Sequence, residues 1–267
     1  MSSTPLAEFA AKHAAALERD EARYNLLLGI LSAAAQNPTA RLQTWTMGPA
    51  GACAIRAQGR PIVLGALERD QCRALAEETR ELDYPGVVGV DLAPAWFVEC
   101  AVDLGLRFAE PIPQRIHALR DRPIYPGTAG QARQVSQEDA TLFADWLISF
   151  VREAVPHDPL PSRIELENIA GQGRHTFWVA KDTPVAMAGI ARRSRTTGTI
   201  TAVYTPPALR GRGYAGSVTA AVAERILAEG KAAVCLYTDL RNPASNRCYA
   251  KIGFKPVCDA WHYVRQG

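Results

Sequence analysis

The residues best suited to chemistry form a glycine-rich loop in the last third of the chain. Arg210, Gly211, Arg212 and Gly213 follow an extended apolar stretch, residues 199–204, and lead into a helical pattern. A loop of this kind at the start of a helix turns several backbone N–H groups outward, where the positive end of the helix dipole adds to them. The two arginines supply further positive charge. The pattern predicts a site for a ligand that carries a pyrophosphate.

Two nucleotide-binding alternatives share this glycine pattern. Gly211, Gly213 and Gly216 satisfy G-x-G-x-x-G, and Asp239 stands after the next predicted strand, where dinucleotide-binding folds place a ribose-binding acid. Those folds carry the pattern after the first strand of a large parallel sheet, whereas fewer than thirty residues follow Asp239 here. A nucleotide P-loop is excluded because no Gly-Lys-Ser/Thr follows the glycines. We therefore expect no dinucleotide at this loop.

The elements that must position the loop form a block of mixed α/β character. Apolar residues of the helix after the loop recur at helical spacing until Gly230, a glycine typical of helix ends. Asn242 and Pro243 mark the start of a later short helix, which Gly253 ends. The predicted strands of this block are residues 132–135, 176–180, 185–192, 199–204, 232–238 and 261–264, and its predicted helices are residues 136–150, 215–229 and 243–252.

An earlier block repeats this order of elements. Where the second block has its glycine loop, the first has Glu68-Arg69-Asp70-Gln71, which carries no phosphate-binding pattern. We therefore predict two related α/β domains with mixed sheets, residues 1–120 and 131–267, joined by a linker at 121–130 that is rich in proline and glycine. The predicted helices of the first block are residues 6–17, 24–35, 69–81 and 94–106, and its predicted strands are residues 42–47, 52–57, 61–67, 87–92 and 113–119.

The composition argues against several other functions. A net charge of +3 without any run of like charge gives no reason to expect nucleic acid or an anionic membrane as a partner. The longest apolar run, residues 26–35, is shorter than the roughly 20 residues that span a bilayer, and the N-terminus has no signal-peptide pattern. The six cysteines lack C-x-x-C spacing and the five histidines are widely separated. We expect a cytoplasmic monomer or homodimer without a bound metal.

Two landmarks in the second block together resemble the GNAT superfamily of acyl-CoA-dependent N-acetyltransferases. The pyrophosphate loop of that superfamily reads Gln/Arg-x-x-Gly-x-Gly/Ala, and Arg210-Gly211-Arg212-Gly213-Tyr214-Ala215 matches it at every specified position. The second landmark is an asparagine followed about seven residues later by a tyrosine, in a helix that ends in Leu/Ile-Gly-Phe. Asn242, Tyr249 and residues 252–254 match it. The resemblance covers residues 135–264, and the first block is similar to a degenerate copy of the same domain.

The resemblance implies a splayed mixed β-sheet flanked by helices, with acetyl-CoA or another acyl-CoA held where two parallel strands part. By the same comparison, backbone groups of Val203 and Thr205 pair with the pantetheine arm. The N–H groups from Gly211 to Gly216 hold the pyrophosphate. Asn242 would touch the cofactor beyond the loop, and Tyr249 would protonate the leaving thiolate. An amine that attacks a thioester directly needs a base, an oxyanion stabiliser and an acid, but no covalent nucleophile.

The general base has several candidates, because the strands beside the loop lack the glutamate that many GNAT relatives carry there. The titratable candidates are Asp239, Glu165, Glu167 and His262, and deprotonation through a water molecule is an alternative. The sequence thus predicts transfer of an acyl group, acetyl first of all, to a primary amine of a small molecule or peptide. A CoA-binding regulatory or interaction module without turnover is the second hypothesis, which the lack of an obvious base motivates.

Overall fold

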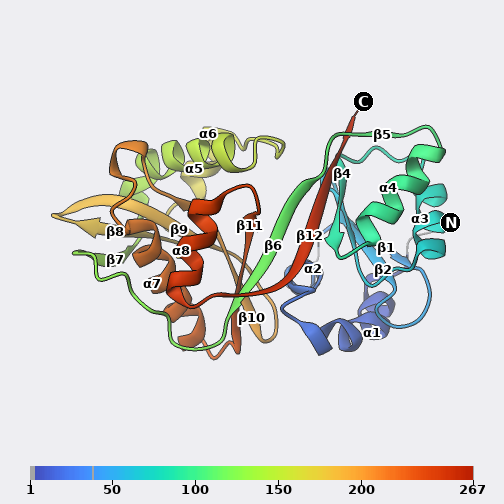
Figure 1. The fold of residues 1–267 in the computed structure, drawn as a ribbon, viewed down its shortest axis with the longest axis horizontal. Coiled ribbons are helices and arrows are strands. Elements are labelled where there is room, and N and C mark those ends of the chain that lie inside the picture. Colours follow the sequence, from blue (N-terminus) through green and yellow to red (C-terminus); the bar gives the residue numbers. More distant parts are fainter. Residues whose placement is uncertain (1–3, 38, 267) are drawn as a thin grey trace. The chain divides into compact units, whose positions relative to one another are not determined.

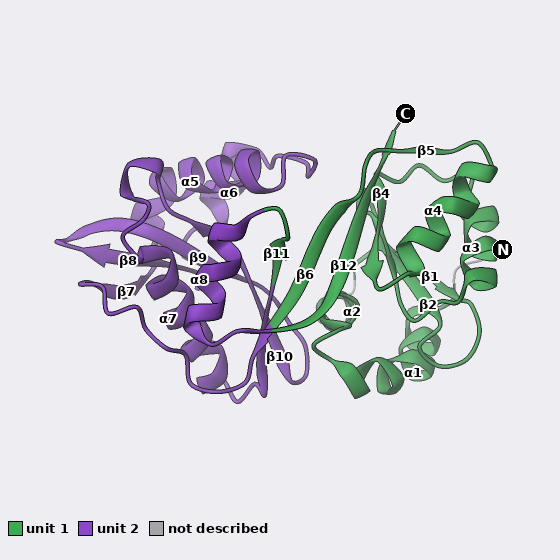
Figure 2. Cartoon of the chain, in the orientation of Figure 1, with its two compact units in different colours: residues 1–117, 237–241, 256–267 green, residues 118–236, 242–255 purple. Residues whose placement is uncertain are grey.

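The computed structural model describes residues 4–37 and 39–266, and it confirms a mixed α/β architecture in which helices flank β-sheets (Figure 1). The chain divides into two compact units (Figure 2). Unit 1 consists of residues 1–117, 237–241 and 256–267, and unit 2 consists of residues 118–236 and 242–255.

Unit 1 contains a sheet with the strand order β1-β2-β3-β4-β12-β6, and β5 pairs with β12. Strands β3 and β4 run parallel, with a helix between them in the sequence, whereas β12 pairs with β4 in the antiparallel direction. The helices are α1 (Leu6–Leu17), η1 (Glu18–Asp20), α2 (Asn25–Ala35), α3 (Arg69–Thr79) and α4 (Ala93–Asp103), and the strands are β1 (Leu42–Thr46), β2 (Cys53–Ala57), β3 (Ile62–Leu64), β4 (Gly86–Val90), β5 (Arg107–Phe108), most of β6 (Ile112–Leu119) and most of β12 (Lys255–Gln266).

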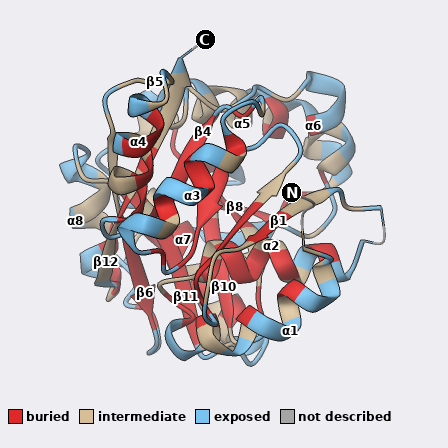
Figure 3. Cartoon of the chain, turned by 90° about the vertical axis from the view of Figure 1, so that its right-hand side faces the viewer, coloured by how far each residue is buried: buried red, intermediate tan, exposed pale blue. Residues whose placement is uncertain are grey.

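Alternation along the strands of unit 1 builds two cores, one on each face of the sheet. Ile62 and Leu64 of β3 pack with residues of α3 and α4, whereas Val63 between them packs with residues of α1 and α2. Successive side chains of a strand point to opposite faces, so each helix pair covers one face. Figure 3 shows helices α1 and α3 with exposed residues on their outer sides.

The last strand of the chain belongs to unit 1. Strand β12 pairs with β4 from Ala260–Val90 to Val264–Gly86 and therefore completes the sheet that the first half of the chain begins. The domains expected from the sequence, 1–120 and 131–267, differ from the compact units in this respect. They rest on the order of elements along the chain, which carries no information on a partner far away in sequence.

Unit 2 contains a sheet with the strand order β11-β10-β9-β8-β7, in which β10 and β11 are parallel and the remaining neighbours are antiparallel. Its helices are η2 (Gln137–Asp139), α5 (Ala140–Ala154), α6 (Arg163–Ile169), η3 (Pro207–Leu209), α7 (Tyr214–Ala228) and α8 (Pro243–Ile252), and its strands are β7 (Gln131–Gln134), β8 (His175–Ala180), β9 (Thr183–Arg193), β10 (Thr197–Tyr204) and the larger part of β11 (Ala233–Asp239).

The sheet of unit 2 is also covered on both faces. Ala186, Ala188 and Ile190 of β9 pack in one cluster with residues of α7 and α8, whereas Met187 packs in another with Phe143 of α5. The parallel pair β10–β11 is joined by α7, as β3–β4 is joined by α3 in unit 1. Each unit therefore contains the same strand–helix–strand arrangement, in agreement with the predicted relationship between the two blocks.

His175 lies inside unit 2 as a buried titratable group. Its ring centroid is 4.6 Å from that of Phe143, and a Cβ at Gly189 on the neighbouring strand would lie only 2.4 Å from its Cδ2 atom. Burial, with a smaller contribution from the charge of Arg174, lowers the pKa of His175 to about 4. The imidazole is therefore neutral in the folded protein at neutral pH.

This burial predicts an acid-sensitive stability. The folded-state pKa lies below the unfolded value of about 6.5, so the stabilising contribution is complete above pH 6.5 and is lost as the pH falls toward 4. Between pH 7 and pH 5 the loss is about 2 kcal/mol. Urea unfolding of the wild type and of His175→Gln at both pH values measures it, and the variant should lose less stability. Equal losses in both proteins would contradict the prediction.

Candidate functional site

The candidate site begins where β10 and β11 stop pairing. In the described chain, their parallel register ends at Thr199 and Cys235. Further along β10, Ala202 has a φ of 51°, a conformation rare for a residue with a side chain, and the register of β10 against β9 shifts around it. Such bulges redirect backbone groups and are common beside binding sites. Val203, expected to pair with an extended ligand, directly follows this bulge, and its role stays a prediction.

Thr205, directly after β10, has a hydroxyl group without a partner. Thr205 is 8 % exposed, and its Oγ1 atom is buried with no hydrogen-bond partner among the described residues. Leaving such a group unsatisfied costs about 1–3 kcal/mol. We therefore expect a ligand or a water molecule to supply the missing hydrogen-bond partner of this hydroxyl group.

Arg210 is exposed, and its side chain bonds back to the protein. Its Nε donates to the carbonyl oxygen of Thr205 at 2.9 Å, and its Nη2 lies 2.5 Å from Oε2 of Glu153 on α5. The guanidinium also lies over the ring of Tyr204, 5.9 Å from its centroid. Arg212 folds back in a similar way, because its Nη2 donates to the carbonyl of Ala208 at 3.3 Å. Both arginines were expected to bind phosphate, and this role stays a prediction; the contacts described also brace the loop and keep positive charge beside it.

The start of α7 has the form expected of an anion site. Gly211 and Gly213 have φ values of 78° and 83°, which glycine adopts without strain, and Gly213 is the N-cap of the helix. Tyr214, Ala215 and Gly216 form the first turn, whose N–H groups have no acceptor within the helix. The 15-residue helix adds the positive end of its dipole.

The three glycines of the motif, Gly211 and Gly213 in the loop and Gly216 in α7, have different surroundings. A Cβ at Gly211 would meet no atom within 4 Å, so this residue faces open space. A Cβ at Gly213 would lie 2.8 Å from Thr128, and one at Gly216 would lie 2.7 Å from Pro126. Gly211 is therefore the loop glycine that a ligand can approach most closely.

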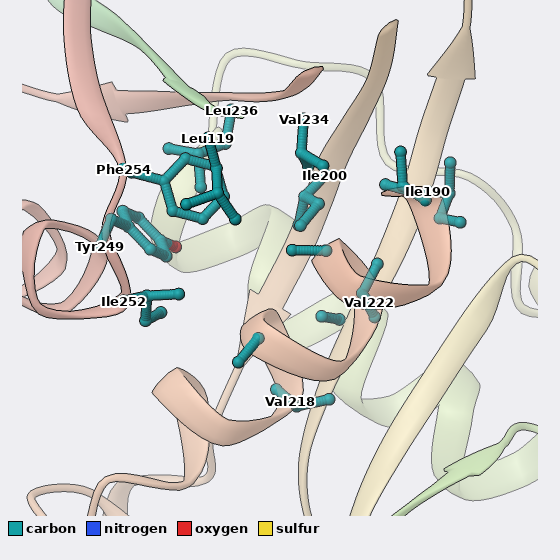
Figure 4. Packing of buried hydrophobic residues seen from close by; sticks show 14 of the residues in the cluster. Leu119, Ile190, Ile200, Val218, Val222, Val234, Leu236, Tyr249, Ile252 and Phe254 are labelled. Carbon is teal, nitrogen blue, oxygen red and sulfur yellow. The ribbon is translucent and has the colours of Figure 1, made fainter. Parts of the chain in front are cut away.

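Helix α8 lies beside the loop through its contact with α7. Asn242 caps α8, as predicted, by accepting a 3.1 Å hydrogen bond from the backbone N–H of Ser245, and Gly253 ends the helix with a φ of 109°. Tyr249 packs in the cluster between α7, α8 and the sheet (Figure 4), with its ring edge-on to Phe254 at 6.1 Å. Burial raises the pKa of Tyr249 above its ordinary value. A proton donor must be protonated at working pH, and this shift keeps it so.

Asp239 lies at the end of β11, in the part that belongs to unit 1. Its carboxylate accepts hydrogen bonds from Arg241, at 2.7 Å from the backbone N–H and 2.9 Å from Nη2. The bonds to the Arg241 side chain, and then that to its backbone, lower the pKa of Asp239. A carboxylate held in this way is a weaker proton acceptor, which argues against Asp239 as the base.

Glu165 is part of the N-terminal cap of α6. Its carboxylate accepts hydrogen bonds from both the hydroxyl and the backbone N–H of Ser162 at 2.8 Å, and these bonds lower its pKa. The same reasoning weakens its candidacy as a base. Glu167 lies 3.5 Å from Arg163 in an ion pair on the same helix, and His262 is buried in β12. No structural feature selects a base among these residues, and its identity stays a prediction.

The corresponding helix of unit 1 begins differently. Glu68 is the N-cap of α3, and Gln71 completes a capping box by accepting a 2.9 Å hydrogen bond from the backbone N–H of Glu68. An acidic side chain at this position occupies the helix start and repels an anion. The absence of a phosphate-binding loop, expected from the sequence of the first block, agrees with this arrangement.

The residues of the loop fit the group that the fold implies. An acyl-CoA carries a pyrophosphate, which suits the first turn of α7, and an extended amide-containing arm, which suits the end of β10. Gly211 leaves room for the close approach, and the Thr205 hydroxyl needs a partner. No cluster of His, Cys, Asp or Glu side chains in the described residues could hold a metal ion. None of the helices described is long and apolar enough to cross a membrane.

Comparison with known proteins gives a family-model match over one segment and several structures with a similar fold. Residues 178–265 match the family model described as FR47-like protein. A GCN5-related N-acetyltransferase from Kribbella flavida is similar in structure, with a TM-score of 0.59 at 17% identity over 90% of this chain and 96% of that one. A Drosophila protein gives 0.62 at 18% identity over 84% and 79%. A tandem GNAT protein of clavulanic acid biosynthesis gives 0.51 at 16% identity over 86% and 83%. A comparison with curated sequences gave no match.

The matched segment covers only part of the chain, and the similar structures show its fold. The chain has the fold of the GNAT N-acetyltransferase superfamily, in a tandem form, and its FR47-like segment contains the glycine loop and the α8 landmark. The resemblance expected from the two motifs is thus confirmed.

Proposed function

We propose that the protein transfers an acetyl or other acyl group from acyl-CoA to the primary amine of a small molecule or peptide. The observation that carries this proposal is the start of α7, where Gly211 faces open space next to a helix N-terminus. The unpartnered Thr205 hydroxyl at the adjoining end of β10 supports it. The acyl-transferase character of the class supports the reaction type.

In this proposal each residue group has a separate task. The N–H groups at the start of α7 bind the pyrophosphate, and Arg210 and Arg212 hold the loop in shape. Backbone groups of Val203 and Thr205 orient the pantetheine arm, and the N-cap Asn242 contacts it further on. Bound acyl-CoA supplies an activated thioester. Tyr249, protonated because burial raises its pKa, donates a proton to the departing sulfur.

Thermal unfolding with added acetyl-CoA, CoA and NADH, each in a separate titration, tests the binding part of this proposal. A ligand that binds only the folded state stabilises it by about 2.7 kcal/mol at a hundredfold excess over Kd. We expect acetyl-CoA and CoA to raise the melting temperature and NADH to leave it unchanged. Stabilisation by NADH alone would contradict the proposal and favour the dinucleotide alternative.

A CoA-binding module without turnover is the second candidate function. Two of the three carboxyl groups named as candidate bases accept hydrogen bonds from neighbouring donors, Asp239 from Arg241 and Glu165 from Ser162. Release of free thiol from acetyl-CoA, measured across a panel of small-molecule and peptide amines, separates the two. Amine-dependent thiol release supports catalysis, whereas tight binding without release from any amine supports the regulatory module.

A further inference from the structure

Most of the segment expected to be a linker, residues 121–130, packs along α7. Residues 122–130, called the strap below, lie in unit 2, and Figure 2 shows this part of the chain passing beside α7 on its way to β7. Within the strap, the phenol of Tyr125 donates to Oε2 of Glu224 on α7 at 2.7 Å. The backbone N–H of Ile124 donates to the carbonyl of Ile252 at the end of α8 at 2.9 Å.

The strap also packs on the first turn of α7. The side chains of Pro126 and Thr128 occupy the spaces beside Gly213 and Gly216, where a Cβ at either glycine would lie under 3.0 Å from them. The strap therefore leaves no room for a side chain at Gly213 or Gly216, whereas Gly211 has no such neighbour. The open space at Gly211 suits the approach of a ligand, whereas the contact with the strap explains the glycines at positions 213 and 216.

A partly buried hydrogen bond connects the strap to the start of α7. The hydroxyl groups of Thr128 and Ser217 are 2.6 Å apart, and Ser217 is 0 % exposed. The backbone N–H of Ser217 in turn donates to the carbonyl of Gly213, the N-cap, at 3.1 Å. The end of the strap is fixed as well, because the indole N–H of Trp178 donates to the carbonyl of Ala129 at 3.1 Å.

We propose that the strap is a positioning element of the CoA site, with Thr128 as its central residue. It holds the first turn of α7 in the conformation that presents the N–H groups to the pyrophosphate. The start of a helix frays unless it is packed or capped, and the N-cap Gly213 has no side chain that could cap α7. The affinity part of this inference rests on the proposed function.

Thr128→Val tests the inference, because it removes the hydroxyl and keeps the shape of the side chain. Tyr125→Phe is the matched control: it removes the other hydrogen bond from the strap to α7, at Glu224, about 10 Å further along the helix than Ser217. We expect Thr128→Val to weaken CoA binding about tenfold and Tyr125→Phe to change it less than about twofold. Isothermal calorimetry with CoA measures both.

Hydrogen exchange of the backbone amides of residues 214–218 provides a readout without ligand. These amides should exchange faster in Thr128→Val and at the wild-type rate in Tyr125→Phe. Equal CoA affinities and equal exchange rates in the two variants would overturn the inference, since the strap would then serve stability alone. If the wild type itself binds no CoA, the proposed function fails, and the exchange rates alone decide on the strap.

A second pair of variants tests the contact between the strap and α7 through a residue of the helix. Gly216→Ala places a Cβ against the ring of Pro126, and Pro126→Ala removes the ring atoms that it would meet. We expect Gly216→Ala to accelerate exchange at residues 214–218, and the double variant to restore most of the wild-type rate. A double variant that exchanges as fast as Gly216→Ala would overturn the proposed contact between strap and loop.

Discussion

Replacing Gly211 by aspartate is expected to lower the affinity for CoA by at least about 100-fold without lowering the stability of the free protein. The new side chain enters open space, since no atom lies within 4 Å of a Cβ at this position. Aspartate tolerates a positive φ better than most residues, and a carboxylate near the start of α7 interacts favourably with the helix dipole. The same carboxylate repels a pyrophosphate. Calorimetry with CoA and a thermal unfolding curve measure the two effects.

Two control variants separate charge from shape and from backbone strain. Gly211→Asn has the same shape without the charge and should lose less affinity than Gly211→Asp. Gly230→Asp, at the other end of α7, has a φ of 81° and equally open surroundings, and it should leave CoA binding unchanged. Gly213 is less suitable for this test, because a side chain there would displace Thr128. Wild-type affinity in Gly211→Asp would show that the loop does not bind the pyrophosphate.

Tyr249→Phe is expected to lower kcat about 100-fold or more while the KM for acetyl-CoA changes little, if Tyr249 is the general acid. The fold should persist, because the ring keeps its edge-on packing against Phe254. Burial raises the pKa of Tyr249, so loss of its proton should not limit wild-type turnover until the pH exceeds the ordinary tyrosine value of about 10. Steady-state kinetics between pH 6 and pH 10 measure both effects.

The control for this variant is Tyr84→Phe, which removes a phenol from another buried ring, in unit 1. It should leave kcat unchanged. Full turnover in Tyr249→Phe would show that another group, or water, protonates the thiolate, and the role given to Tyr249 would be wrong.

Local signals predicted most elements of the fold. The bounds of α1 and α8 agree with the predicted ones, residues 6–17 and 243–252, and caps mark both ends of α8. Asn242 and Gly253 mark the ends of α8 through one side chain and one backbone conformation, which a sequence displays directly. Elements of this kind depend on their own residues and their immediate neighbours.

Other features of the structure were not predicted from the sequence. Helix α6 was missed although Ser162 and Glu165 form a capping box, since seven residues are too few to show an apolar period. The bulge at Ala202 and the packing of the strap on α7 had no local signal, because alanine rarely adopts a positive φ and a Pro/Gly-rich segment reads as a linker. The hydrogen bonds that Asp239 accepts from Arg241 and Glu165 from Ser162 are local in sequence, but they were not predicted when the two carboxylates were named as candidate bases.

The pairing of β12 with β4 has a consequence for the order of folding during synthesis. Because 170 residues separate Ala260 from Val90, the ribosome must make all of unit 2 before β4 receives this neighbour. Until then one edge of β4, with its unpaired backbone groups and apolar side chains, is open to other chains. A fragment that ends after residue 120 would keep this edge exposed permanently. Attempts to produce the first half alone should therefore yield aggregates, and adding residues 256–266 as a separate peptide should restore solubility.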